Sequence, residues 1–366
     1  MKIKIGKNLI GKNEPCFIIA EAGVNHNGDL KLAKKLIDKA REAGVDAVKF
    51  QTFKAEKIVT LNAKQAKYQT KNTDKKESQY EMLKRLELSY PDFEELKRYC
   101  KRKKIIFLST AHSCKEDVDL VARLCPAIKI ASGDLTNLPF LEYAAKKDLP
   151  IILSTGMGNL EEVKEAVKTI LPVNEKLILL HCTTNYPTPF NEVNLLAMKT
   201  MEKEFSLPVG YSDHTEGIKI SLAAAALGAC IIEKHFTLDK KLPGPDHKAS
   251  LEPEELKEMV LGIRKIEKRL KNGEKSSDLI KELKVEESLG NGVKKPTKSE
   301  LEVAKVARKS IVSAQNIKKG KIIEEKMLAI KRPGTGLEPK FIDKLIGKKA
   351  KFDIKKDKLI KFGDLS

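Results

Sequence analysis

Residues 208–235 read PVGYSDHTEGIKISLAAAALGACIIEKH, and this stretch decides the fold class. Two short apolar runs, Pro208–Ser212 and Cys230–Lys234, each end within two residues of a histidine, His214 and His235. The residues between the runs are rich in alanine, which favours a helix. A strand, a helix and a second strand in this order predict neighbouring parallel strands. Both imidazoles would then emerge at the same end of the sheet and could supply half or more of a transition-metal site.

The same layout repeats along the chain, because β-rich runs alternate with amphipathic helical stretches such as Leu30–Ala43, Leu160–Ile170 and Pro253–Lys271. Eight strands alternating with helices predict a closed (β/α)8 TIM barrel of roughly 275 residues, in the α/β class. A doubly wound open sheet is the alternative, but the even spacing and the lack of a G-x-G-x-x-G turn argue against it. The expected strands are Cys16–Ala20, Val45–Phe50, Ile105–Ser109, Ala127–Ala131, Pro150–Ser154, Leu177–Cys182, Pro208–Ser212 and Cys230–Lys234.

Two segments depart from this rhythm. Thr52–Leu88 is long and polar, follows the second strand, and is expected to be functional or mobile on the active face. After the barrel domain, residues 1–275, we expect a linker over 276–300 and a small second domain over 301–366. Its expected strands are Ser310–Ala314, Leu328–Lys331 and Lys358–Phe362. About 60 residues is marginal for independent stability, so this domain should dock on something larger.

The composition narrows the functional class. The formal charge is +19, from 70 basic and 51 acidic residues. The lysines are spread along the chain, which is typical of a solvated Lys/Glu-rich surface and also suits an anionic substrate. A protein that binds nucleic acid or polysaccharide is the non-enzymatic alternative, although the chain has no Trp for stacking on bases.

The cysteines bear on the cellular compartment. Six are present without a C-x-x-C pair, which favours reduced thiols and a cytoplasmic location. We recognise neither a signal peptide nor an apolar run long enough to span a membrane, so we expect no membrane partner.

Polar side chains follow every predicted strand, and reacting groups of TIM barrels collect at the carboxyl ends of strands. Lys49 and Lys129 lie near two of these ends. A lysine inside a barrel is costly unless it meets an anion, whereas the alternative is an outward lysine with a solvated head. Together with Ser132, Ser154 and Ser212, the two lysines indicate a cradle for phosphate and carboxylate. Asp246, in a proline-rich loop, is either a fixed carboxylate or part of a surface turn.

At these residues the chain resembles the sialic acid synthase family, in order and nearly from end to end. The tail, from Arg308 through Pro333-Gly334, looks like the antifreeze-like SAF domain, a β-clip fold, that follows the barrel in this family. The matching stretches of the barrel are 18–28, 48–52, 128–133, 181–189, 210–214, 233–237 and 243–246.

The resemblance implies an enzyme that condenses phosphoenolpyruvate with an open-chain N-acetylmannosamine-type sugar and releases phosphate. The product would be a nine-carbon 2-keto sugar acid, N-acetylneuraminate or legionaminate. The stretch from Ser132 to Pro139 is closer to those two branches than to the pseudaminate branch. Pseudaminate synthase and a 3-deoxy sugar-acid phosphate synthase remain alternatives.

The resemblance also assigns roles to residues. It implies a divalent cation, manganese or alternatively magnesium, on His214 and His235, and a domain-swapped homodimer in which the tail of one subunit closes the site of its mate. Glu21 would act near the reacting carbons and Asp134 on the attacking water. The phosphoenolpyruvate ligands would be Lys49, Thr110, Lys129, Ser132, Ser154, Asn185 and Ser212. The sugar would meet Gln51, Tyr186, Asp246 and, from the mate's tail, Arg308.

Overall fold

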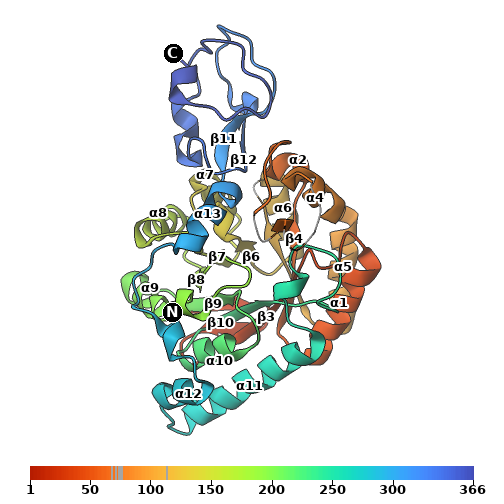
Figure 1. Ribbon diagram of the computed structural model, residues 1–366, viewed down its shortest axis with the longest axis vertical. Helices are drawn as coiled ribbons and strands as arrows, with labels where there is room; N and C mark the ends of the chain where they lie inside the picture. Colours follow the sequence, from red (N-terminus) through yellow and green to blue (C-terminus); the bar gives the residue numbers. More distant parts are fainter. Residues whose placement is uncertain (67–68, 71, 73–76, 113) are drawn as a thin grey trace.

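The computed structural model describes residues 1–66, 69–70, 72, 77–112 and 114–366. Its main part is a closed barrel of parallel strands in the order β10-β3-β4-β5-β6-β7-β8-β9 (Figure 1). Because β10 pairs with β3 and closes the ring, the predicted TIM barrel is confirmed and the open doubly wound sheet is wrong. The strands are β3 (Phe17–Gly23), β4 (Ala47–Thr52), β5 (Ile106–Ala111), β6 (Ile128–Ile130), β7 (Ile151–Ser154), β8 (Leu177–Cys182), β9 (Val209–Asp213) and β10 (Ile231–His235).

Helices surround the barrel, so most of its strands are buried on both faces. Local sequence sets their ends: α1 begins after Asp29, whose side chain accepts a hydrogen bond from the Lys31 amide, and ends at Gly44 with a φ of 83° that suits glycine. The described α-helices are α1 (Leu30–Ala43), α2 (Ala55–Ile58), α4 (Gln79–Leu86), α5 (Tyr90–Lys103), α6 (Lys115–Leu124), α7 (Leu138–Ala145), α8 (Leu160–Ile170), α9 (Ala197–Phe205), α10 (Lys219–Ala226), α11 (Pro253–Lys271), α12 (Ser276–Leu283) and α13 (Lys298–Ala307).

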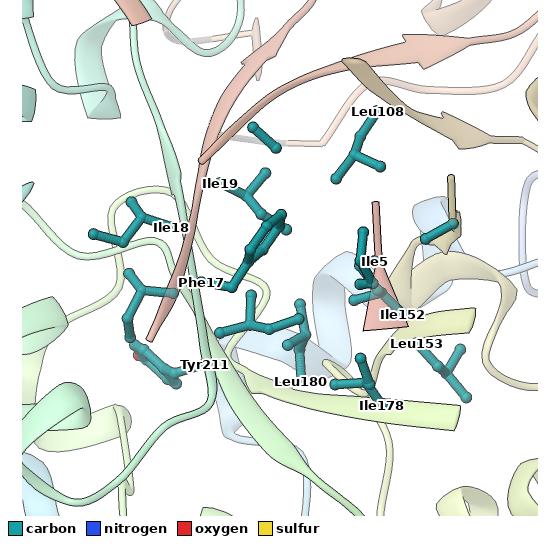
Figure 2. Packing of buried hydrophobic residues seen from close by; sticks show 14 of the residues in the cluster. Ile5, Phe17, Ile18, Ile19, Leu108, Ile152, Leu153, Ile178, Leu180 and Tyr211 are labelled. Carbon is teal, nitrogen blue, oxygen red and sulfur yellow. The ribbon is translucent and has the colours of Figure 1, made fainter. Parts of the chain in front are cut away.

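A hairpin that the sequence analysis did not predict precedes the barrel. It consists of β1 (Lys2–Ile5) and β2 (Asn8–Gly11), which pair antiparallel. Ile5 is fully buried and belongs to the same hydrophobic cluster as Phe17, Leu108 and Leu180 of the barrel strands (Figure 2). The turn at Gly6 lies against the first residue of β5, so the hairpin covers the amino-terminal end of the barrel, away from the predicted active face.

The C-terminal unit has its own hydrophobic cluster, which includes Ile311, Ile354 and Ile360. The predicted strands near 310 and 328 are present as β11 (Ser310–Ser313) and β12 (Leu328–Lys331), paired antiparallel. The expected strand over 358–362 is reduced to one bridge between Val312 and Leu359. The segment predicted as a linker contains helix α12, which packs on α10. Short 3-10 helices are η1 (Ser132–Asp134), η2 (Phe190–Glu192), η3 (His247–Ala249), η4 (Glu286–Leu289), η5 (Glu325–Met327), η6 (Pro339–Lys344) and η7 (Phe362–Asp364).

The C-terminal unit docks on the barrel beside α2 and α7 (Figure 1). The backbone of Arg332 donates to the Ile58 carbonyl at 2.9 Å and accepts from the Thr60 amide at 3.1 Å. Glu300 of α13 accepts hydrogen bonds from the amides of Met157 and Thr184, at 2.6 and 2.8 Å. These contacts attach the unit near the carboxyl ends of the strands.

All six cysteines are free. In the part of the chain that the structure describes, no helix combines the length and apolar composition that a membrane span requires.

Candidate active site

The carboxyl ends of the barrel strands surround a cavity that encloses about 980 Å³ of empty space, part of it open to solvent. Every strand of the barrel contributes to its lining, which is the rim where TIM barrels carry their chemistry. The lining side chains from the strands are Glu21, Lys49, Gln51, Thr110, Lys129, Ser154, Cys182, Ser212, Glu233 and His235.

Four buried charged groups form an alternating network in this cavity. The Lys49 ammonium lies 2.7 Å from a Glu21 carboxylate oxygen and 3.7 Å from Glu233, and Lys129 lies 3.7 Å from the other oxygen of Glu233. Each of the four side chains is at most 6% exposed. Hydroxyl groups complete the network, because Lys49 donates to Thr110 at 2.9 Å and Lys129 donates to Ser154 at 2.7 Å.

Burial and charge pairing act against each other on these groups. Burial raises the pKa of Glu21, although Lys49 opposes the change. Burial alone would also raise the pKa of Glu233, but Lys129 and Lys49 outweigh it and hold that pKa below its ordinary value. Burial lowers the pKa of Lys129, whereas Glu21 and Glu233 outweigh burial at Lys49 and raise its pKa. The two lysines are therefore held inside the barrel by carboxylates, as their cost in an apolar interior requires.

The two histidines lie side by side, as the sequence predicts. Their ring centroids are 5.7 Å apart, and the Tyr186 ring lies 4.1 Å from His214 and 5.6 Å from His235. His214 Nδ1 lies 2.7 Å from the Thr183 carbonyl oxygen. A carbonyl only accepts, so Nδ1 carries the proton and the lone pair of Nε2 faces the Tyr186 hydroxyl at 3.1 Å.

These imidazoles have the properties of metal ligands. Burial lowers the pKa of His214 to about 4 and that of His235 well below its usual value, so both are neutral at pH 7. His235 Nδ1 is buried, and no described residue forms a hydrogen bond with it. Within the described ranges, no third His, Cys, Asp or Glu completes a three-ligand set with them. The residues therefore fit a cation that takes its other ligands from water and substrate.

A second buried ion pair lies directly behind the histidines. Lys234 and Asp213 are partners in the β9–β10 register, with the ammonium 2.9 Å from the carboxylate and neither side chain exposed. Asp213 also accepts hydrogen bonds from Thr215 and Ser221. Alternation along the strands thus places Lys234 and Asp213 outside the cavity and His235 inside it.

Comparison with known proteins agrees with this geometry. Residues 36–275 match the NeuB family and residues 308–366 match the SAF domain. The chain belongs to the NeuB family. It is 50% identical over 349 residues to the N,N'-diacetyllegionaminic acid synthase of Campylobacter jejuni, covering 94% of this chain and 98% of that protein. It is 37% identical over 356 residues to human N-acetylneuraminate-9-phosphate synthase, covering 96% and 93%.

A solved structure supports the same assignment. The spore coat polysaccharide biosynthesis protein SpsE of Bacillus subtilis superposes with a TM-score of 0.83 at 38% identity, covering 100% of this chain and 99% of that one. The resemblance to sialic acid synthases stated from the motifs is therefore confirmed, and so is the SAF domain at the C-terminus. Barrel and tail occur together over almost the whole length of these NeuB relatives.

The structure brings most of the predicted site residues of this NeuB chain into the one cavity. The residues that line it are Glu21, Lys49, Gln51, Thr110, Lys129, Ser132, Ser154, Tyr186, Ser212, His214, His235 and Asp246. Their individual roles stay predictions.

Three predicted site residues do not line the cavity. Asp134 is fully buried in η1, where it accepts a hydrogen bond from the Asn137 side chain at 3.0 Å. Asn185 lies in the turn after β8, where its backbone bonds to Thr183 and Thr188.

Arg308, the third, pairs with both carboxylate oxygens of Glu162 at 2.7 and 2.8 Å, and it donates to the Met157 carbonyl. Its guanidinium therefore fastens the end of α13 to α8. Within its own chain Arg308 does not line the cavity, and its delivery from the tail of a mate stays a prediction.

Arg332 lines the cavity instead, and the sequence analysis missed it. It follows β12 and begins the Arg-Pro-Gly turn, which is the signal that could have identified it. A Cβ on Gly133 would lie 2.8 Å from the Ala307 carbonyl oxygen and 3.9 Å from Nη2 of Arg332. Glycine at 133 thus allows the end of α13 and this arginine to approach the turn after β6 closely.

Proposed function

We propose that the protein condenses phosphoenolpyruvate with the open-chain form of an N-acyl mannosamine-type sugar and releases inorganic phosphate. The observation that carries the proposal is one cavity in which two neutral imidazoles lie beside two lysines that are hydrogen-bonded to hydroxyl groups. An enol phosphate presents a phosphate and a carboxylate, and each needs cationic and hydroxyl donors. Membership of the NeuB family supports the same reaction.

In this reaction the enol carbon of phosphoenolpyruvate forms a bond with the aldehyde carbon of the sugar. Water then adds to the carbon that bears the phosphate, and cleavage of its C–O bond expels phosphate. A divalent cation, manganese or magnesium, on His214 and His235 would polarise the aldehyde oxygen. Lys49, Lys129 and the serines would hold the donor so that its enol carbon faces the aldehyde. Fixing the two reactants together can supply about 7–11 kcal/mol of the barrier.

An anionic donor needs positive charge beyond the buried network of lysines and glutamates. The charges of Lys49, Lys129, Glu21 and Glu233 sum to zero, so these four side chains alone attract no anion strongly. The cation and Arg332 would supply the positive charge that the phosphate and carboxylate require. Gln51, Tyr186 and Asp246 would contact the sugar, because they line the same cavity.

For the acceptor we propose a sugar that yields an N-acetylneuraminate- or legionaminate-type product, with the diacetamido acceptor favoured. The Campylobacter relative, at 50% identity, is named for an N,N'-diacetyl product. We also propose a cytoplasmic location, because six free cysteines, five of them buried, suit a reducing compartment.

The test is a phosphate-release assay with purified full-length protein. Release should require phosphoenolpyruvate, an N-acyl mannosamine-type sugar and a divalent cation together, and a nine-carbon keto acid should appear in equal amount. Lys129→Met should lower kcat/KM for phosphoenolpyruvate by at least about tenfold, because a charge-assisted contact is lost. Phosphate release without any sugar, or none with a panel of N-acyl hexosamines, would refute the proposal.

The domain-swapped homodimer stays a prediction. In the single chain, Arg332 lines the cavity of its own barrel; exchange of the tails would place the same arginine in the partner's cavity. Mixing inactive His235→Ala and Arg332→Ala proteins under conditions of subunit exchange should restore a measurable part of the activity if tails are exchanged. A mixture of exchanged subunits that stays inactive would indicate that Arg332 acts within its own chain.

A further inference from the structure

One wall of the cavity has a different chemistry from the strand ends. It is built by α4, where Gln79, Met82, Leu83 and Leu86 share one helix face at i, i+3, i+4 and i+7. All four are buried, and all four line the cavity. The segment between β4 and α5, which breaks the strand–helix rhythm of the sequence, thus supplies part of the cavity.

This wall carries no charge. Met82, Leu83 and Leu86 also pack in a small cluster with Val24 that is separate from the main core of the barrel. An apolar surface of this kind binds methyl groups well and desolvates a phosphate without compensation. The part of the acceptor that faces α4 should therefore be uncharged.

The one buried polar group on this helix face is the amide of Gln79. Its side chain is 1% exposed, and its Nε2 lies 3.5 Å from Oε1 of Gln69, at the limit of a hydrogen bond. Its Oε1 is buried and meets no hydrogen-bond donor among the residues that the structure describes. A buried amide oxygen without a donor is costly, so a ligand that brings an N–H to it gains more than it would in water.

We propose that Gln79 is a specificity-determining residue for the acceptor. Its Oε1 accepts a hydrogen bond from the N–H of an acetamido group, and the methyl of that group lies against Met82 and Leu83. The inference rests on the proposed function, because it names a contact of the same acceptor.

The proposed contact distinguishes between acceptors. The acetamido group of N-acetylmannosamine sits on the carbon next to the aldehyde, which must face the histidines. We assign the contact with α4 to a second acetamido group, because an acceptor that carries two can place one beside the aldehyde and the other against Gln79. The site should therefore prefer a diacetamido acceptor over N-acetylmannosamine, and both over N-acetylmannosamine 6-phosphate.

The experiment compares kcat/KM for these three acceptors in the wild-type protein and in two variants. Gln79→Met keeps the length of the side chain but removes the amide, and it should reduce the preference for the diacetamido sugar by about five- to tenfold, as expected for one lost hydrogen bond. Gln79→Glu keeps an accepting oxygen and should retain most of the preference. Gln65→Met is the matched control, because this nearby amide does not line the cavity.

Each outcome bears on a defined claim. An unchanged preference in a folded Gln79→Met protein would overturn the inference, and so would an equal loss in the Gln65→Met control. A wild-type protein that prefers the phosphorylated acceptor would overturn it as well. Absence of turnover with all three acceptors in the wild type would instead count against the proposed function.

Discussion

The buried pair of Lys234 and Asp213 offers the sharpest test of how the histidine strands are held. The change is Lys234→Met, which keeps most of the side-chain volume and removes the ammonium. Both partners are 0% exposed and 2.9 Å apart, so the variant leaves a carboxylate in the interior without a counter-charge. Removing one partner of such a pair costs about 3–5 kcal/mol of folding free energy.

The assay is thermal unfolding followed by circular dichroism on full-length protein. For a chain of this size the loss should lower Tm by about 5 °C or more. Adding Asp213→Asn should recover at least half of it, because the amide oxygen still accepts from Thr215 and no charge remains buried. Lys39→Met is the control: its pair with Glu42 lies at the surface, so Tm should hardly change. A Lys234→Met protein with the Tm of the wild type, or a double variant no better than the single one, would refute the reasoning.

Three further predictions follow from the cavity. In Gly156→Ala the new Cβ would lie 2.1 Å from Thr184 Oγ1 and 2.7 Å from Cys182 Sγ. Such overpacking costs about 1–3 kcal/mol of folding free energy, so Tm should fall, and KM for phosphoenolpyruvate should rise. An unaltered Tm would contradict the packing. Burial, and to a smaller extent the charge of Glu21, raises the pKa of Asp246 from 3.8 to about 7. The unfolded chain therefore loses this proton more readily than the folded protein, and the fold loses stability as pH rises from about 4 to 7. The stability gained by Asp246→Asn in chelator-treated protein should therefore grow from pH 5 to pH 8 by about 2–3 kcal/mol, measured by urea unfolding; a pH-independent difference would exclude the shift. Chelation should stop phosphate release, manganese should restore it, and calorimetry should detect manganese binding to the wild type but not to His235→Ala; binding that survives in the variant would move the cation elsewhere.

Local patterns predicted the barrel well, because each strand and helix carries its own signal. The helices over 30–43, 160–170 and 253–271 have the predicted bounds, since caps and 3.6-residue periodicity fix them within a few residues. The hairpin before β3 was missed, because its strands are only four residues long; Lys2–Ile5 alternates between exposed and buried residues, but a run this short does not stand out. The tail arginine could not be settled from local sequence: Arg308 and Arg332 both lie at element ends, and docking of the tail brings Arg332 to the cavity of its own chain, whereas the role of Arg308 toward a mate stays a prediction.

Local sequence was enough to predict the number and order of the barrel strands, and with them the rim at which polar side chains meet. It also placed His214 and His235 on neighbouring strands, since strand periodicity and the βαβ rule act over short distances along the chain. Only the tertiary structure decided which charges pair: Lys49 with Glu21 and Glu233, and Lys234 with Asp213. It alone brought α4 and Arg332 to the cavity. Such pairings depend on closure of the barrel and docking of the tail, which join residues far apart in sequence, and no local pattern encodes them.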